Sequence, residues 1–584
     1  MRFLRVGLIA LATAVVTACA GGGGGGGGSV VPPGIPAPTP TNSSITNLTV
    51  DQTFSGPAGT TTNEFDLTSG TTVSGSGSAD TLSVSYNAAA KSYTVSVSGR
   101  SQTFGAGDII SNASGETRFR KDGATERDIL TLVTTPYSGS TSNQYVGLGY
   151  WQRSSIVGDR QDDQFATFVY GLDTPAAAMP RTGRANFRID VFGLASVPGY
   201  EPSVLQGGGS FDVDFLAGVF STSTMLTETE LLTGDRVYGG GLELIGAGTL
   251  SSTSNFSGSI TAGIKNVNLT GSLSGRFYGP GAEEVGASFS ATNSAGASFT
   301  GSFTGQRGHG PAVNLTLTNM VALERFMAYG SSLFVSRLDG DTNAQVRIYP
   351  RIGPIEDRTG GKFWFSPGSS DMPRGEFTPA SIVSSNDPNF TAYEETFEGR
   401  GVRLELFKIG AANTQLALTY SSLGRWRSTE VAGVWTTNQH HSFVYGLETP
   451  PRLLAARTGT ARYEGVAYGT GANWTTGTEY DVSGTSVFNV NFSQQTYSGD
   501  LTLSGRSNAG TIDFGRYDFA GPLSVYVAET AVPLTHGGAQ AGDLATRFYG
   551  PTGEEIGGAF TVFVPESVQA GQIRIGGATV ARRR

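Results

Sequence analysis

One eleven-residue segment occurs twice in the chain, and this repeat constrains the fold more than any other feature. Residues 276–286 read RFYGPGAEEVG, and residues 547–557, which lie 271 positions later, read RFYGPTGEEIG. A second pair, FVYGLDTP at 168–175 and FVYGLETP at 443–450, is 275 positions apart. These separations are far longer than the periods of solenoid repeats. The sequence therefore predicts a tandem duplication of a lobe of roughly 270 residues.

The composition predicts an all-β fold with mainly antiparallel sheets. The 584 residues include 84 glycines, and only 15% of them are charged. Segments such as 93–98 and 487–492 alternate apolar with polar residues, which places one face of a strand in a core and the other in water. The best candidate helix is Thr318–Tyr329, although this segment could also be irregular. A chain of this length exceeds one hydrophobic core, so each lobe should contain two domains.

The amino terminus predicts a lipid-anchored protein. Residues 1–18 combine Arg2 and Arg5 with a short apolar run, as secretion signals do, and Val16–Cys19 has the pattern of a bacterial lipobox. Cys19 is the only cysteine, so it is the predicted lipidation site; the alternative is an unmodified thiol inside a signal peptide. The Gly-rich and Pro-rich residues 19–44 predict a tether without a core.

Charge and motifs exclude several classes of function. The net charge is −9 and no run of Lys or Arg suggests a phosphate-binding surface, so no nucleic-acid partner is expected. No zinc-protease, nucleophile-elbow or phosphate-loop motif is present, and we expect neither an enzyme nor a cofactor or metal. The adjacent His440 and His441 would point to opposite faces of a strand, which disfavours a shared metal or haem. We expect them at a strand end on the surface.

The repeated segment, the lipobox and the glycine-rich tether resemble those of transferrin-binding protein B and its surface-lipoprotein relatives. The resemblance implies two lobes, each with a mostly β handle and an eight-stranded soluble barrel, anchored on the outer membrane. It also implies capture of an iron- or haem-carrying protein for a TonB-dependent receptor. The expected boundaries are a signal peptide at 1–18, a tether at 19–44, handles at 45–144 and 313–416, and barrels at 145–312 and 417–584.

Features that both copies share should mostly describe the scaffold. In the repeated segment, Gly279 and Pro280 end a strand and the two glutamates lie in the turn, which predicts a hairpin. We expect Phe277 and Phe548 inside the barrels, with the glutamates solvated or capping backbone amides. The alternative is a ligand contact that both lobes share.

Ligand specificity should lie where the copies differ. The second handle has aromatic residues and arginine near prolines, a composition typical of protein interfaces. The alternative is that Phe363 and Phe365 fill the handle core and only Trp364 faces water. The predicted ligand-binding residues are Arg347, Tyr349, Phe363, Trp364 and Phe365.

Two classes of function remain after this reasoning. The first is a binding receptor that passes an iron- or haem-carrying protein, or another macromolecular or small nutrient cargo, to an outer-membrane transporter. The second is a structural or adhesive surface lipoprotein, in which the barrels are spacers. A barrel that itself spans the outer membrane is disfavoured by the lipobox.

Overall fold

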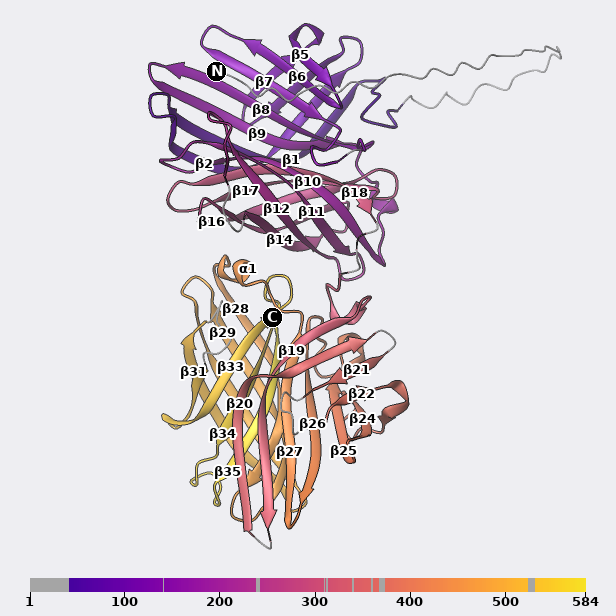
Figure 1. Cartoon of the computed structure of the whole chain (residues 1–584), viewed down its shortest axis with the longest axis vertical. Helices are drawn as coiled ribbons and strands as arrows, with labels where there is room; N and C mark the ends of the chain where they lie inside the picture. Colours follow the sequence, from indigo (N-terminus) through magenta and orange to yellow (C-terminus); the bar gives the residue numbers. More distant parts are fainter. Residues whose placement is uncertain are drawn as a thin grey trace, which may run out of the picture.

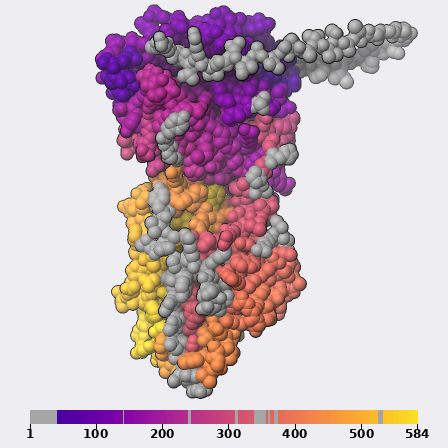
Figure 2. Space-filling view, viewed as in Figure 1, coloured from indigo at the N-terminus to yellow at the C-terminus, as the bar shows by residue number. Residues whose placement is uncertain are grey.

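The computed structural model shows two lobes along one long axis (Figures 1 and 2). In each lobe an open antiparallel sheet, the handle, packs against a barrel. No helix in the described part of the chain is long and apolar enough to cross a membrane. For residues 338, 341–354 and 358 only the backbone is described. The structure describes residues 41–139, 141–237, 242–308, 310, 313–338, 341–358, 361–366, 373–523 and 531–584.

The first handle is a nine-stranded sheet in the order β4-β3-β2-β1-β9-β8-β7-β6-β5. Its hydrophobic core contains Trp151, which is fully buried. The strands are β1 (Gln52–Asp66), β2 (Thr71–Asn87), β3 (Ser92–Val97), β4 (Arg100–Phe104), β5 (Ile109–Ala113), β6 (Glu116–Asp122), β7 (Glu126–Val133), β8 (Val146–Val157) and β9 (Arg160–Gly171).

The first barrel closes because β11 pairs with both β10 and β12. The ring contains eight strands, and the short β13 adds to the edge of β12. The strands are β10 (Arg184–Ser196), β11 (Ser203–Asp214), β12 (Val219–Glu230), β13 (Arg236–Val237), β14 (Glu243–Leu250), β15 (Asn255–Ile264), β16 (Val267–Tyr278), β17 (Glu284–Thr292) and β18 (Ser298–Gly308).

The second handle repeats the first, in the order β22-β21-β20-β19-β27-β26-β25-β24-β23. Trp426 occupies the position of Trp151 and is likewise buried. The strands are β19 (Glu324–Leu338), β20 (Asp341–Arg358), β21 (Lys362–Phe365), β22 (Gly375–Phe377), β23 (Ile382–Val383), β24 (Phe390–Phe397), β25 (Arg400–Phe407), β26 (Ser421–Ala432) and β27 (Trp435–Gly446).

The second barrel is a closed ring of eight strands in sequence order. The predicted all-β class with two duplicated handle-and-barrel lobes is therefore confirmed. The strands are β28 (Thr460–Asn473), β29 (Glu479–Asn491), β30 (Thr496–Ser507), β31 (Gly510–Pro522), β32 (Val532–His536), β33 (Ala539–Tyr549), β34 (Glu555–Phe563) and β35 (Ile573–Arg583). The helical segments are α1 (Pro451–Ala455) and the 3-10 turns η1 (Ala106–Asp108), η2 (Ala176–Ala178), η3 (Leu317–Asn319), η4 (Pro379–Ser381) and η5 (Gly410–Ala412).

The division between handle and barrel lies later than the predicted boundaries at 145 and 417. Strands β8 and β9 belong to the first handle, and β26 and β27 belong to the second. The reason is a long-range pairing: β9 lies against β1, with Ala58 opposite Phe168. Local alternation shows that β9 is a strand, but it does not show which sheet receives it.

The predicted helix at Thr318–Tyr329 is wrong. Most of this segment leads into or forms β19, which pairs with β20 and β27. Its apolar residues do not share one buried face, because Leu323 is 59% exposed while Phe326 is buried. From Phe326 onward successive side chains enter two different cores, Phe326 and Ala328 one core and Met327 and Tyr329 the other, which is the alternation of a strand buried on both faces.

The repeated segment forms the same hairpin in both barrels, as predicted. It joins β16 to β17 in the first barrel and β33 to β34 in the second. Phe277 and Phe548 point into the barrel cores, and Tyr278 and Tyr549 are fully buried. Gly279 has φ of 85°, a left-handed conformation that a side chain would strain. The segment therefore serves the construction of the barrels.

The second glutamate of each repeated segment ties its barrel to its handle. Glu284 and Glu555 are each only 4% exposed, and each carboxylate accepts three backbone N–H groups that precede a handle strand or begin it. The predicted capping of backbone amides is confirmed for these two residues. The donors are Gln144, Tyr145 and Val146 for Glu284, and Thr419, Tyr420 and Ser421 for Glu555, at 2.6–3.0 Å.

The segment between the lobes forms hydrogen bonds with both of them. The buried Asp214 of the first barrel accepts hydrogen bonds from Thr316 Oγ1 at 3.2 Å and from Asn319 Nδ2 at 3.1 Å. Between them, the Leu317 N–H donates to the Thr419 carbonyl of the second lobe at 2.8 Å. In addition, α1 of the second lobe contacts β14 and β15 of the first barrel. These bonds fix the connection between the lobes.

Candidate functional site

Seven large apolar side chains are exposed together on the first lobe, and we call this group the apolar end. Their exposed fractions run from 41% to 74%. Single exposed apolar residues are normal on a protein surface, but a contiguous group marks a site of interaction. The seven are Leu67, Val73, Ile156, Val157, Tyr200, Leu231 and Leu232.

The turns that carry these residues lie side by side. The Leu67 N–H donates to the Asp159 carbonyl at 2.8 Å, which joins the β1–β2 turn to the β8–β9 turn. A Cβ on Gly70 would lie 3.0 Å from Leu232 Cδ1, so the β12–β13 turn touches the β1–β2 turn on its other side. Handle and barrel thus both contribute to one surface.

The loop between β10 and β11 completes the apolar end. The Thr72 N–H donates to the Tyr200 carbonyl at 2.8 Å, and the Leu231 N–H donates to the Pro202 carbonyl at 3.0 Å. Tyr200 therefore lies between the start of β2 and the β12–β13 turn. The apolar end consists of two handle turns and two barrel loops.

Side-chain hydrogen bonds order these turns. Asp66 accepts the Ser69 backbone N–H at 2.9 Å, and this bond is the main reason that the pKa of Asp66 is lowered from its usual value. Glu201 accepts the backbone N–H groups of Leu232 and, at 2.9 Å, Thr233. Turns held in this way present their apolar side chains at a reduced entropic cost of binding.

Paired charges border the apolar end. Arg160 lies 3.2 Å from the Glu64 carboxylate. Lys265 donates to Glu230 at 2.8 Å, which is the main reason that the pKa of Glu230 is lowered, and the Lys265 ammonium lies 5.3 Å from the centre of the Tyr200 ring. An apolar centre with a polar border has the composition of a protein interface. The arrangement can bury apolar side chains of a partner.

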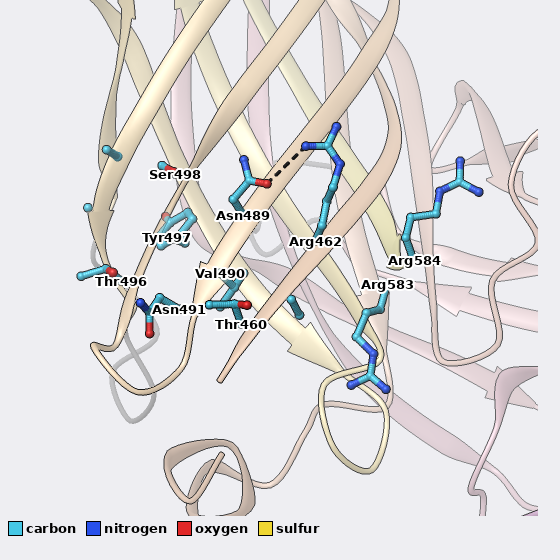
Figure 3. A pocket seen from close by; sticks show the side chains of 13 residues that line it. Thr460, Arg462, Asn489, Val490, Asn491, Thr496, Tyr497, Ser498, Arg583 and Arg584 are labelled. Atoms are coloured by element: carbon cyan, nitrogen blue, oxygen red, sulfur yellow. Dashed lines mark hydrogen bonds between the residues drawn. The ribbon is translucent and has the colours of Figure 1, made fainter. Parts of the chain in front are cut away.

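A hollow of about 810 Å³ at the mouth of the second barrel is less suited to binding (Figure 3). Arg462 points to Asn489, whereas Arg583 and Arg584 point in other directions (Figure 3). Glu464 pairs with both Arg462 and Arg584, at 3.0 and 2.6 Å. The arginines therefore do not converge on a common ligand position.

The predicted aromatic group of the second handle is divided by strand alternation. Phe365 is 1% exposed and stacks on Phe443 with ring centres 4.8 Å apart, so it lies in the core. Phe363 is half-buried and lies 5.8 Å from Tyr393 on the same side. Trp364 is half-buried on the opposite face. This agrees with the alternative interpretation, in which the two phenylalanines fill the core.

Three other predicted residues are not placed by the structure. Arg347 and Tyr349 belong to β20, and only the backbone of these two residues is described. Cys19 lies outside the described residues, as do the predicted signal peptide and most of the tether. Their roles remain predictions.

The two adjacent histidines point to opposite faces, as predicted, but they do not lie at a surface strand end. His440 and His441 are both buried in β27, because one face of this strand packs towards the barrel strand β29 and the other packs on the handle core beside Trp426. His440 Nε2 is 3.0 Å from Glu479, whereas the His441 ring lies 5.0 Å from that of Trp426. Burial lowers the pKa of His441 to about 3. Among the described residues, no group of three or more His, Cys, Asp or Glu side chains could hold a metal ion.

The sequence reasoning missed the apolar end. Its strongest local signal is a pair of apolar residues directly beside a turn, as in Ile156-Val157 before Gly158 and Leu231-Leu232 before a Thr-Gly turn. Strand ends normally carry polar residues there, so such pairs indicate exposed apolar turns.

Comparison with known proteins identifies the second barrel. Residues 456–583 match the family described as C-lobe and N-lobe beta barrels of Tf-binding protein B. No curated protein matches the chain. The solved transferrin-binding protein B of Neisseria meningitidis serogroup B is 17% identical, with 82% of this chain and 89% of that chain covered and a TM-score of 0.23. The Haemophilus parasuis protein is 15% identical, with 77% and 85% covered and a TM-score of 0.24.

These superpositions of whole chains are poor, so the family match of the second barrel carries the comparison. It includes the second copy of the repeated segment, at 547–557. Through its second barrel, the chain is therefore similar to the barrel family of transferrin-binding protein B, which confirms the resemblance inferred from that segment.

Proposed function

We propose that the protein is a receptor-type lipoprotein of the outer-membrane surface, which captures a protein cargo through the apolar end of its first lobe. The observation that carries this proposal is the group of seven exposed apolar side chains on four ordered turns. Such a surface gains free energy when a partner covers it, at about 25 cal/mol per Å² of apolar area. An inert spacer has no need of it.

The cargo that we propose is an iron- or haem-carrying protein, which a TonB-dependent receptor would then accept. The support is the match of the second barrel to the transferrin-binding protein B family. The solved proteins from Neisseria meningitidis and Haemophilus parasuis are named for transferrin binding. Cys19 would hold the lipid anchor, and residues 20–44 would form the tether. Arg347, Tyr349 and Trp364 remain predicted as a second contact, on the second handle.

The experiment compares capture by matched variants of a soluble form spanning residues 45–584. Iron-loaded transferrin, haemoglobin and iron-limited growth medium are passed over immobilised protein, and bound species are identified by mass spectrometry. We expect a double change, Val157→Ser with Leu232→Ser, to reduce capture at least tenfold. Val431→Ser is the control, because Val431 is 71% exposed on the corresponding hairpin of the second lobe, against 74% for Val157.

The result that contradicts the proposal is specific. Capture by the wild type that survives the double change would remove the apolar end from the function. No capture of any iron- or haem-carrying protein would instead favour the structural or adhesive class.

A further inference from the structure

The border of the apolar end carries an excess of acidic residues. It comprises the four turns of the apolar end and the β15–β16 turn beside them, in the segments 64–73, 155–162, 197–202, 228–237 and 264–267. These segments contain eight Asp and Glu residues but only three Lys and Arg residues. The excess of five negative charges is more than half of the net charge of −9 of the whole chain. This end of the molecule is therefore strongly acidic.

On the handle side, one cation faces four acids. The Arg160 guanidinium lies 3.2 Å from the Glu64 carboxylate and 3.7 Å from that of Asp66, so two anions share it. Asp159 and Asp162, which flank Arg160 in the sequence, are exposed. The two handle turns therefore keep a net negative charge.

On the barrel side, Lys265 is shared in the same way. Its ammonium lies 2.8 Å from the Glu230 carboxylate and 3.4 Å from that of Glu228, and its side chain is only 7% exposed. A buried cation between two carboxylates has little charge left to attract an anionic partner. Asp235 and Arg236 of the β12–β13 turn are both exposed and offset each other. The barrel loops therefore add to the negative charge of this end.

The turn that carries the exposed acids of the handle differs between the lobes. It reads IVGDRQD at 156–162, whereas the corresponding turn of the second lobe, 275 positions later at 431–437, reads VAGVWTT. Val434 stands in the place of Asp159, and the second turn has no charged residue. Both lobes form the same hairpin, so the fold does not require these acids.

We infer that the apolar end binds a partner protein whose contact surface has an apolar centre surrounded by lysine and arginine side chains. The inference rests on the proposed function, because it takes the apolar end as the surface that meets the cargo. Burial of the apolar centre supplies affinity, whereas opposite charges at the border raise the association rate and exclude wrong partners. The acidic border repels anionic lipid headgroups, and it repels the same end of a second copy of the chain. A basic partner fits both the centre and the border.

The test measures the binding of two amphipathic peptides to the soluble form spanning residues 45–584. The peptides are acetyl-LKKLLKLLKKLLKL-amide and acetyl-LEELLELLEELLEL-amide, which have the same leucine face and opposite charge. Fluorescence anisotropy, with the same dye on each peptide, gives the Kd at about 50 and about 300 mM NaCl, because salt screens exposed charges. We expect the lysine peptide to bind at least about tenfold more tightly than the glutamate peptide at the lower salt concentration, and the difference to shrink at the higher one.

A pair of matched variants tests the acids themselves. Asp159→Asn combined with Asp162→Asn removes two exposed charges and leaves the apolar residues in place. We expect this double variant to bind the lysine peptide about three- to tenfold more weakly, the effect of two exposed charge pairs. The control, Asp513→Asn combined with Glu566→Gln, removes two exposed charges from the second lobe and should leave the Kd unchanged.

Val157→Ser combined with Leu232→Ser locates the binding, and it should weaken the lysine peptide at least about tenfold. Equal binding of the two peptides, or no binding of either, overturns the inference. A loss in the Asp159 and Asp162 variant that is no larger than in the control overturns it too. Lysine-peptide binding that survives the loss of Val157 and Leu232 would show unspecific attraction and would also overturn it. Sedimentation of the wild type with phosphatidylglycerol vesicles would assign the apolar end to a membrane instead.

Failure of this inference differs from failure of the proposed function. Capture of an iron- or haem-carrying protein that responds neither to salt nor to Asp159→Asn combined with Asp162→Asn would leave the receptor standing and overturn the basic partner. Tight binding of the lysine peptide, with no capture of any iron- or haem-carrying protein, would support the basic partner and contradict the proposed cargo.

Discussion

The buried glutamate of the second repeated segment supplies the sharpest test of how handle and barrel are joined. Glu555 Oε1 accepts the Thr419 N–H at 2.6 Å. Its Oε2 accepts the Tyr420 N–H at 3.0 Å and both the N–H and the hydroxyl of Ser421 at 2.8 Å. Glu555→Gln can keep the bonds to one oxygen, but its amide group then faces the donor of Thr419.

The expected cost of Glu555→Gln follows from this geometry. Glu555→Gln loses one charge-assisted hydrogen bond and leaves a buried N–H unpaired, so the free energy of unfolding should fall by about 2–4 kcal/mol. The matched control is Glu554→Gln. Glu554 is only half-buried, and its carboxylate accepts one hydrogen bond from the Thr552 backbone N–H at 2.9 Å and one from the Thr552 hydroxyl at 2.5 Å. Glu554→Gln should therefore lower the free energy of unfolding by less than about 1 kcal/mol.

Urea unfolding at pH 8, followed by tryptophan fluorescence, measures both variants. Four of the five tryptophans, all except Trp151, belong to the second lobe, so the signal reports mainly on that lobe. Burial raises the pKa of Glu555 despite the opposing effect of its hydrogen bonds, which is why an alkaline buffer is chosen to favour the carboxylate. Equal costs for Glu555→Gln and Glu554→Gln would refute the reasoning that this residue joins barrel to handle.

Four further predictions concern the second lobe and the anchor. Burial raises the pKa of Glu479, but hydrogen bonds from His440 and Asn438 outweigh this effect and lower it to about 2. Its contribution to stability, up to about 3 kcal/mol, is therefore present above its usual pKa and is lost as the pH falls from about 4.5 towards 2. Urea titrations should show the difference between wild type and Glu479→Gln shrinking over this range, and a constant difference would contradict it. Phe548→Ala should cost about 3–5 kcal/mol as a truncation in the core, whereas Trp364→Ala should leave the melting temperature nearly unchanged while weakening cargo binding; unfolding of the lobe by Trp364→Ala would place that side chain in the core. Cys19→Ala should move the protein from the membrane to the soluble fraction and abolish labelling with radioactive palmitate, and retained membrane association would exclude Cys19 as the anchor.

Local patterns were sufficient wherever a feature depends on neighbouring residues. The hairpin of the repeated segment follows from Gly279 and Pro280, and the inward direction of Phe277 follows from strand alternation. The helical spacing at Thr318–Tyr329 misled because pairing with two other strands overrides a weak local preference. The spacing of apolar residues in a sequence therefore predicts a helix or a strand reliably only when the same residues are the ones that become buried on one face.

Features that depend on distant residues were beyond local patterns. The handle boundary is set by β1 pairing with β9, more than a hundred positions later. The apolar end brings together Leu67, Val157 and Leu232 from three separate turns. His440 is buried beside Glu479, a partner from a different domain, and nothing around the histidine in the sequence indicates that carboxylate. Such sites depend on topology as well as on sequence.

The duplication itself separates scaffold from function. Residues that both lobes retain, such as Glu284 and Glu555, join barrel to handle in the same way. Where the two lobes have different residues at corresponding positions, the fold does not require the residue that only one lobe contains. Phe165 in the first lobe shows that a buried histidine at 440 is not needed for packing. Polar or exposed apolar residues at such positions lower the stability of a lobe unless a ligand or partner offsets the cost, so the differences between the copies are where binding should be tested.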